Sequence, residues 1–233
     1  MTRREPTLPS ISRRAAISLL VLAFGLLPAN AQGPKRITTE QPDSVPLFRS
    51  VSVSFDLLGA GELILGDYGQ IEAALKVNLR DKYFPTLELG YGKADKEDPT
   101  TNVSYCTKAP YGRIGIDFNM LKNKHDDYRL YTGVRYGFTS FKYDVSAPGV
   151  VDPVWGGTTD LKTEDVSATC HWLEALVGID AKIWGPVHLG WSIRYKRRIH
   201  HTEGDVGEPW YTPGFGRKAT SRIGGSFNFT IEI

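Results

Sequence analysis

Residues 173–183, with the sequence LEALVGIDAKI, decide the fold. All odd-numbered positions of this stretch are apolar, whereas the even-numbered positions hold Glu174, Asp180 and Lys182 beside a leucine and a glycine. A period of two places successive side chains on opposite faces of a β-strand. The stretch therefore predicts a strand with one apolar face and one face that carries charges of both signs.

The same alternation recurs along the chain and predicts eight strands in all. They are expected near residues 51–60, 71–80, 84–93, 113–120, 129–138, 173–183, 187–198 and 222–232. From residue 51 onward no helical period of 3.6 residues is sustained. A tilted strand crosses a membrane with about 9–11 residues, which is the length of these segments.

Two features distinguish a membrane barrel from a soluble barrel, whose apolar face would point inward. The polar faces mix glycine and serine with acids and bases, as a narrow lumen that neutralises its own charges would require. The expected connections also alternate in length: 81–83, 122–127 and 184–186 are short, and 94–109, 146–169 and 204–221 are long. Short turns at one end and long loops at the other are typical of outer-membrane barrels. We therefore predict an all-β fold, a closed, antiparallel, up-and-down transmembrane β-barrel with eight strands.

The N-terminal segment is interpreted as a signal for export. Arg3, Arg4, Arg13 and Arg14 precede the apolar run of residues 15–27, and an A-x-A cleavage site follows at 29–31. This pattern is typical of a secretory signal peptide over residues 1–31. Without its four arginines and one glutamate, the remaining chain is slightly acidic, which excludes nucleic acid as a partner. Residues 32–49 are then a flexible periplasmic segment, and residues 50–233 form the barrel.

Several stretches resemble known outer-membrane proteins. Residues 224–233 (GGSFNFTIEI) resemble the terminal signal that the barrel-assembly machinery reads, carried by Gly224, Phe227, Phe229, Ile231 and Ile233. DYGQIEAALKVNLRDKYFP, YRLYTGVRYGFTSFKYDVSAPG and DAKIWGPVHLGWSIRYKRR resemble a family of small, uncharacterised outer-membrane β-barrel proteins of Bacteroidota. The architecture is also similar to eight-stranded barrels of the OmpA and OmpX type. The resemblance implies an outer-membrane location with both termini periplasmic and the long loops extracellular.

The charged residues on the polar faces are expected to lie in the lumen. An eight-stranded barrel is just wide enough for side chains to fill it. We therefore favour a salt-bridged filling over a narrow conduction path. The predicted lumen charges are Glu72, Lys76, Arg80, Glu88, Arg113, Asp117, Arg129, Arg135, Glu174, Asp180, Lys182, Arg194, Lys196, Arg198 and Arg222.

Two further candidates involve the expected outer rim. Cys106 and Cys170 are the only cysteines, and in an exported chain such a pair more often forms a disulfide than a metal site. His200 and His201, with His171, Thr202, Glu203 and Asp205 in the same region, are a weak candidate for a metal or acid–base site. Ordinary solvated rim residues are the alternative interpretation, and no cofactor is expected.

The long loops and one exposed cation are candidate contact sites. Trp155, Trp210, Tyr211 and Phe215 could form an exposed contact surface or could cap the barrel mouth. Arg197 falls on the apolar side of its strand near the outer rim, where it could reach lipopolysaccharide phosphates.

The leading functional hypothesis is a non-enzymatic outer-membrane barrel with a structural or surface-contact role, or a subunit of a larger outer-membrane complex, such as machinery for protein insertion or export. Its expected partners are outer-membrane lipid, lipopolysaccharide, the barrel-assembly machinery and proteins of such a complex. The alternatives are a lipid A-modifying deacylase or acyltransferase and a soluble ligand-binding β-barrel. His188 and Ser192 lie about 13 Å apart along one strand, which is too far for a catalytic dyad.

Overall fold

The computed structural model describes residues 46–151, 156–202 and 207–233, all of which belong to one compact unit, residues 44–233. The predicted signal peptide and Trp155 lie outside the described residues, as does most of the predicted periplasmic segment. The first strand begins at Phe48, two residues before the expected start of the barrel.

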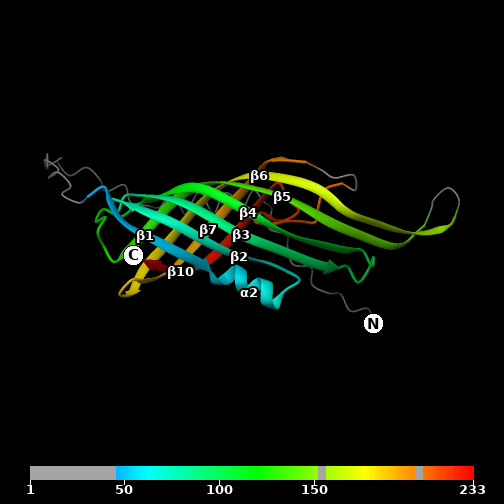
Figure 1. Cartoon of the computed structure of the whole chain (residues 1–233), viewed down its shortest axis with the longest axis horizontal. Coiled ribbons are helices and arrows are strands. Elements are labelled where there is room, and N and C mark those ends of the chain that lie inside the picture. Colours follow the sequence, from blue (N-terminus) through cyan, green and yellow to red (C-terminus); the bar gives the residue numbers. More distant parts are fainter. Residues whose placement is uncertain (1–45, 152–155, 203–206) are drawn as a thin grey trace, which may run out of the picture. The chain divides into compact units, whose positions relative to one another are not determined.

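Eight antiparallel strands form a closed barrel, which confirms the predicted fold class (Figure 1). Each strand pairs with the next in chain order, and the last returns to pair with the first. The strands are β1 (Phe48–Asp56), β2 (Tyr68–Leu79), β3 (Tyr83–Glu97), β4 (Ser104–Asn119), β5 (Tyr128–Val151), β6 (Thr158–Trp184), β7 (Val187–His201) and β10 (Ser221–Glu232). Two very short strands, β8 (Tyr211–Thr212) and β9 (Gly216–Arg217), form a separate small hairpin.

The two ends of the barrel differ. The connections 80–82, 120–127 and 185–186 lie at one end, called here the short-turn end, together with the start of β1 and the end of β10. The opposite end is called the long-hairpin end, because β3–β4 and β5–β6 project there. The connections predicted to be short lie together at one end, but at the other end only the connection 202–220 is long, because most of the other two predicted loops belongs to strands.

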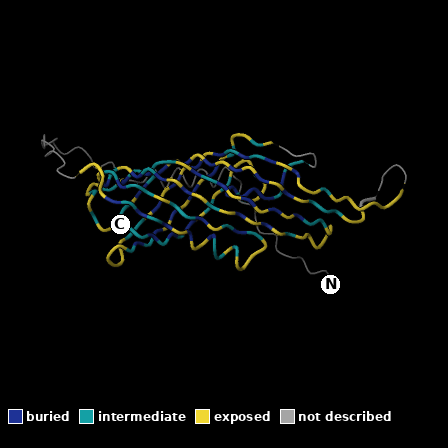
Figure 2. Tube along the Cα trace, viewed as in Figure 1, coloured by how far each residue is buried: buried dark blue, intermediate teal, exposed yellow. Residues whose placement is uncertain are grey.

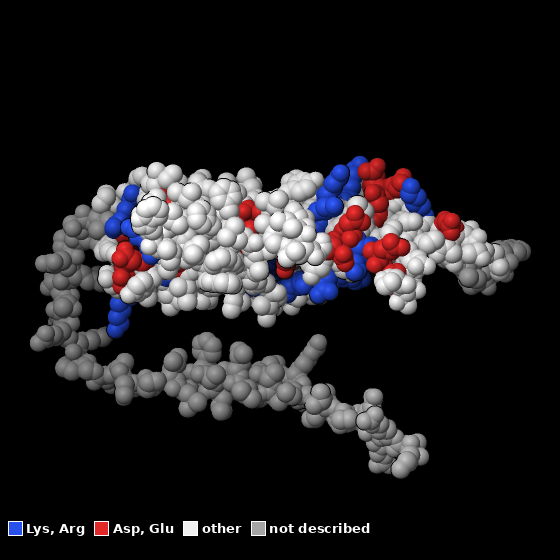
Figure 3. Space-filling view, turned by 90° about the horizontal axis from the view of Figure 1, so that it is seen from below, with Lys and Arg blue, Asp and Glu red and all other residues white. Residues whose placement is uncertain are grey.

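The barrel is apolar outside and polar inside, as β7 shows. Ser192, Arg194 and Lys196 are buried in the interior, whereas Trp191 and Ile193 are 62% and 68% exposed. The same alternation of buried and exposed residues runs along the other strands (Figure 2). On the face seen in Figure 3, charged side chains gather mainly towards the two ends. A soluble barrel would bury its apolar face, so that alternative is wrong. In the part of the chain that the structure describes, no helix has the length and apolarity to span a membrane.

Two predicted loops are largely strand. Residues 94–109 and 146–169 were expected to be long loops, but β3 runs to Glu97, β5 to Val151, and β6 begins at Thr158. Pro148, Gly149 and the many charged residues made these segments resemble loops. Backbone pairing in a hairpin does not require an apolar face, however, and the register shift between Ala147 and Val150 accommodates the proline and glycine.

The first predicted strand is too long, because a helix was missed. β1 ends at Asp56, and α2 (Leu57–Leu65) follows it. The Asp56 carboxylate accepts hydrogen bonds from the backbone N–H groups of Leu58 and Gly59, at 3.1 and 3.3 Å, and so caps the helix. The helix sequence, LLGAGELIL, is apolar on nearly every side and contains two glycines. It therefore has no polar–apolar period of 3.6 residues by which it could be recognised.

Candidate functional site

The middle of the lumen contains a layer of buried ion pairs. Glu88 accepts from three arginines of three other strands: Arg194 at 2.7 Å, Arg113 at 3.0 Å and Arg135 at 3.1 Å. The layer, called here the central charge layer, comprises Glu72, Glu88, Arg113, Asp117, Arg135, Glu174 and Arg194, all of them buried.

Strand register explains why these charges meet. Glu88 of β3 is directly opposite Arg113 of β4, and Arg135 of β5 is opposite Glu174 of β6. Arg113 also reaches across to Glu72, at 2.5 Å. A buried charge without a partner costs several kcal/mol, so each carboxylate needs a facing cation. The alternating strands therefore place opposite charges in register and fill the barrel at this level.

Residues 208–218, called here the plug, fold into the lumen at the long-hairpin side of the central charge layer. Arg113 and Lys196 both donate to the carbonyl oxygen of Gly214, at 2.9 and 2.7 Å. Tyr105 donates to the carbonyl oxygen of Tyr211, at 2.7 Å. Gly214 has a φ of +80°, and a Cβ there would lie 2.6 Å from the ring of Tyr111. Only glycine fits this position. The close packing at Gly214 and the hydrogen bonds to its carbonyl oxygen fix the plug inside the lumen.

The plug corrects the predicted aromatic contact surface. Tyr211 and Phe215 are only 2% and 3% exposed, so they cannot form an exposed surface. Trp210 is half-buried and packs edge-on against Tyr68, with ring centroids 5.9 Å apart. Of the two interpretations that the sequence left open, the exposed surface is therefore wrong for Tyr211 and Phe215. It was considered because an aromatic, proline-rich loop resembles an exposed one. The plug is held in the lumen by Arg113 of β4 and Lys196 of β7, which are distant from most of the plug in sequence.

The plug is held at its base by Glu208. Arg198 of β7 and Lys218 both form ion pairs with this carboxylate. Burial raises the pKa of Glu208, but the hydrogen bonds from Arg198 and Lys218 outweigh it and bring the pKa below the usual range. Arg198, a predicted lumen charge, thus holds the plug.

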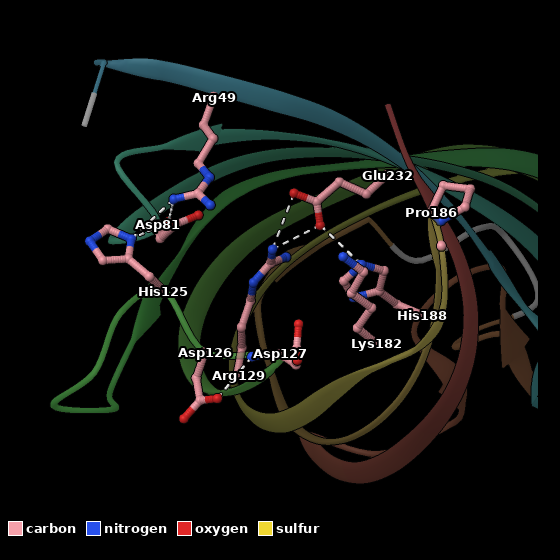
Figure 4. A pocket seen from close by; sticks show the side chains of 11 residues that line it. Arg49, Asp81, His125, Asp126, Asp127, Arg129, Lys182, Pro186, His188 and Glu232 are labelled. Carbon is pink, nitrogen blue, oxygen red and sulfur yellow. Dashed lines mark hydrogen bonds and ion pairs between the residues drawn. The ribbon is translucent and has the colours of Figure 1, made fainter.

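At the short-turn end the lumen opens into a polar basin of about 230 Å³ (Figure 4). Arg129 and His188 both contact Glu232, at 2.8 and 3.2 Å, while Arg49 and His125 contact Asp81. The remaining side chains labelled in Figure 4 are Asp126, Asp127, Lys182 and Pro186. The basin has the size and polarity to hold a small polar molecule.

The basin does not bring a nucleophile to a base. His188 contacts Asp180 through Nδ1 at 3.0 Å and Glu232 through Nε2 at 3.2 Å. Ser192 is hydrogen-bonded instead to Ser226, with the two Oγ atoms 2.6 Å apart. Sequence reasoning missed Arg49, Asp81 and Glu232 as lining residues. Asp81 lies in a turn, which has no strand period, and Arg49 and Glu232 lie at the outer ends of β1 and β10.

The remaining predicted lumen charges have different environments. Lys76 pairs with Asp117 at 3.4 Å, and Asp180 with Arg129 at 3.7 Å, inside the barrel. Arg222 is half-buried at the long-hairpin end. Arg80 is exposed in a turn, so its placement inside the lumen was wrong, whereas Lys182 is exposed at the mouth of the lumen, where it lines the basin. Arg80 has a φ of +57° in the turn after β2, which breaks the alternation.

The predicted disulfide is also wrong. Cys106 and Cys170 are both free thiols. Cys106 lies on β4 and is exposed, whereas Cys170 lies on β6 and is buried, with all of β5 between them. Neighbouring strands are about 4.8 Å apart, so two strand spacings already exceed the reach of a disulfide.

The rim histidines form a small aromatic group. The ring centroids of His171 and His200 are 5.9 Å apart, and Tyr136 Oη lies 2.6 Å from His171 Nδ1. Among the described residues, no group of three or more histidine, cysteine or carboxylate side chains could hold a metal ion. Glu203 and Asp205, which belonged to the candidate site with His201, lie outside the described residues.

The terminal strand has one lipid-side face and one lumen face. Phe227, Phe229 and Ile231 alternate with buried lumen residues, and Phe227 packs on Trp191 with ring centroids 4.4 Å apart. Gly224 belongs to the lumen side, and the exposed Ile233 exchanges backbone hydrogen bonds with Val51. Arg197 is exposed near the long-hairpin end, opposite Ser221 of β10.

The closed eight-stranded wall, apolar outside and charged inside, defines a transmembrane β-barrel of the outer-membrane type. The chain belongs to the family described as "Domain of unknown function (DUF6048)", whose model matches residues 14–233. No curated protein sequence matches it. The Bacteroidota origin implied by the resemblance stays a prediction.

Solved structures with a similar fold include three outer-membrane or surface proteins. Neisserial surface protein A is 11% identical, with a TM-score of 0.41, and the match covers 79% of this chain and 95% of that one. Ail, the attachment invasion locus protein of Yersinia pestis, is 9% identical, with a TM-score of 0.39, covering 81% and 99%. A major outer membrane protein of Thermus thermophilus is 13% identical, with a TM-score of 0.39, covering 79% and 98%. At this distance nothing about their roles transfers to this chain.

Proposed function

We propose that the protein is a non-enzymatic, integral outer-membrane barrel that holds a protein-contact ribbon outside the membrane. The ribbon consists of residues 142–151 of β5 and 158–169 of β6. These strands contain 24 and 27 residues, whereas a tilted transmembrane strand needs about 9–11. The excess length is the observation that carries the proposal, since it serves no purpose in crossing the membrane.

One edge of the ribbon is available for pairing. The β6–β7 ladder ends at Cys170 and His201, and no described strand pairs with residues 158–168 on that side. Free N–H and C=O groups along a strand edge are a template for an added strand. Beyond Ser146, where the pairing of β5 with β4 ends, the ribbon has only two strands and is marginally stable alone. A third strand from a partner would stabilise it.

The side chains of the ribbon suggest the partner's chemistry. Asp160, Glu164 and Asp165 are exposed on β6, and Leu161 is an exposed apolar residue among them. Glu164 pairs with Lys162 and Asp165 with Lys142, but both pairs are exposed, and on this part of β6 the carboxylates outnumber the lysine. Carboxylates on an edge strand discourage pairing between two copies of the same ribbon. The carboxylates of β6 favour a partner strand that carries basic residues, and Leu161 favours an apolar residue in that strand.

The filled lumen supports a structural role. The central charge layer and the plug occupy the interior, where a channel or a catalytic pocket would otherwise lie. In the proposed orientation, the short-turn end with both barrel termini faces the periplasm, and the ribbon is extracellular. Arg197 would then lie near the outer leaflet, within reach of lipopolysaccharide phosphates.

The proposal is tested by shortening the ribbon. Residues 147–161 would be replaced by a two-residue Asn-Gly turn, which keeps every strand pair of the barrel wall. Complexes would then be extracted in mild detergent and sized beside the full chain. We expect the full chain to migrate with a stoichiometric partner and the shortened chain to migrate alone. Heat-modifiable gel mobility would show that both barrels are folded.

Two variants separate ribbon chemistry from ribbon length. Asp160→Lys with Glu164→Lys should release the partner, whereas Lys93→Glu with Lys108→Glu, exposed positions on the paired strands β3 and β4, should retain it. Equal complexes from the full and shortened chains, or a full chain that migrates as a monomer, would contradict the contact role.

A further inference from the structure

The wall of the barrel has a seam where one strand is too short. β1 pairs with β10 only from Ser52–Glu232 to Asp56–Asn228, while β10 continues along β7 as far as Ser221. On the other side, β1 leaves β2 at the pair Phe55–Ala73. Residues 221–227 of β10 and 68–72 of β2 therefore have no β1 between them.

The helix α2 takes the place of the missing strand (Figure 1). It rests closely on β2, because a Cβ on Gly69 would lie 2.2 Å from Leu63 N, and one on Gly59 would lie 2.8 Å from Gln70 O. Towards β10 the fit is looser: a Cβ on Gly225 would meet nothing nearer than Leu58 Cδ2, at 3.7 Å. The helix seals one side of the seam and leaves space along the other.

That space is a cavity that passes through the wall. About 140 Å³ lies between Leu58 of α2, Gln70 of β2 and Gly225 of β10, and its inner end reaches Lys196 and the plug residue Phe215. A second, more open cavity of about 420 Å³ runs along the outside of α2, over Leu57 and Leu65. The two cavities share Leu58, Glu62 and Tyr68 and so adjoin each other.

The two cavities differ in chemistry. Leu65 and Ile223, at the outside, are 89% and 73% exposed and lie on the apolar exterior of the barrel. At the inner end, Arg222 and Lys196 are directly opposite each other in the β10–β7 register. Like charges in such a pair repel. Their hydrogen bonds here go to neutral acceptors, from Arg222 to Arg217 O at 3.2 Å and from Lys196 to Gly214 O at 2.7 Å.

Glu174 lies 3.9 Å from Lys196, and Glu62 lines the outer part of the cavity. Counted over the described residues, both cations still have N–H donors without an acceptor. An anion between Arg222 and Lys196 would relieve their repulsion. We propose that the seam is a lateral binding site for an anionic membrane lipid, whose acyl chain lies along α2 and whose head group meets Arg222 and Lys196. This site is independent of the contact ribbon.

The test is binding of a fluorescent fatty acid, dansyl-undecanoate, to the full chain purified in detergent and stripped of lipid. We expect saturable binding at one site, with competition by oleate or by dioleoyl phosphatidylglycerol. The more effective competitor would identify the source as a free fatty acid or a phospholipid. Dodecanol, which lacks the anionic group, should compete at least tenfold more weakly.

Two variants and a matched control locate the site. Gly225→Trp fills the space beside Leu58 and should weaken binding at least tenfold, and Arg222→Ala should weaken it several-fold. Gly112→Trp is the control, because a Cβ at this glycine on β4 has similarly open surroundings, with a leucine methyl at 3.6 Å, and Gly112 lies on the opposite side of the barrel from β10 in strand order. If Gly225→Trp does not fold, Leu58→Trp fills the same space from the helix.

Three results would overturn the lateral site. They are binding that does not saturate, equal binding by Gly225→Trp and Gly112→Trp, and equal competition by dodecanol and oleate. The first two would mean that the probe dissolves in the detergent belt, and the third that no head-group recognition exists. None of these outcomes depends on the ribbon or its partner.

Discussion

The two halves of β10 are built differently. From Asn228 to Glu232 the strand pairs with β1, and from Ser221 to Phe227 it faces α2 instead. Asp56 marks the boundary, because its carboxylate caps the helix and also accepts the backbone N–H of Phe227, at 3.2 Å. A strand partner closes the wall by hydrogen bonds, whereas a helix covers it by side-chain packing. The helix-covered half is therefore the part where a wall cavity can form.

The interior also differs between the central charge layer, which reaches β7 at Arg194, and the next lumen position of β7, Lys196, beside the plug. In the central charge layer, Glu72, Glu88 and Glu174 each meet two or three arginines, and Asp117 meets Arg135 and Lys76. The seam beside the plug has two facing cations and an open cavity. We therefore expect substitutions to cost most in the charge layer, less at the boundary residue Asp56 and least at the plug.

The largest effect is expected from Arg113→Ala. This change removes one of the two arginines that Glu72, Glu88 and Glu174 share and leaves them only Arg194 in common. Breaking a buried ion pair costs about 3–5 kcal/mol. Urea unfolding of the barrel in lipid vesicles, followed by heat-modifiable gel mobility, measures the loss. A cost below about 1 kcal/mol would mean that the layer does not hold the wall together.

A smaller effect is expected from Asp56→Ala. The variant loses the helix cap and the acceptor for Phe227 N–H, which together are worth about 1–2 kcal/mol. Hydrogen exchange should quicken at residues 57–59 and at residue 227 but not at the β1-paired residues 228–232. Asp56→Asn keeps one acceptor oxygen and should lose about half as much. If hydrogen exchange were equally fast along all of β10 in the unaltered chain, Asp56→Ala and Asp56→Asn, Asp56 would not mark a boundary between two halves of this strand.

The smallest effect is expected at Glu208 and depends on pH. Because its folded pKa is lowered, its contribution to plug stability is present above the ordinary carboxyl pKa and is lost as pH falls through the folded value. Acid should therefore loosen the plug, seen as a red shift of Trp210 emission in a protein that retains only this tryptophan. Glu208→Gln should remove this acid-induced shift, and a shift of equal size in both proteins would contradict this role.

The eight strands could be predicted because every wall strand has lipid on one face and charged neighbours on the other. Glu88 and Arg113 follow this period, and their register then brings them together. α2 could not be predicted in this way, because its sequence is apolar on nearly every side. The gap between β2 and β10 that it covers exists only because β1 ends at Asp56. The plug was missed for a related reason: Gly214 is held by Arg113 and Lys196, residues that are not its neighbours in sequence.

The most direct test compares two tryptophans on opposite faces of the wall. Trp191 is 62% exposed on the outer face of β7, and Trp172 is fully buried on the inner face of β6. Two variants would retain only one of them each and would be reconstituted in vesicles of brominated phosphatidylcholine, which quenches tryptophan within the bilayer. We predict strong quenching of Trp191 and little quenching of Trp172. Equal quenching of both, or stronger quenching of Trp172, would contradict a barrel with its apolar face in lipid and its charges inside.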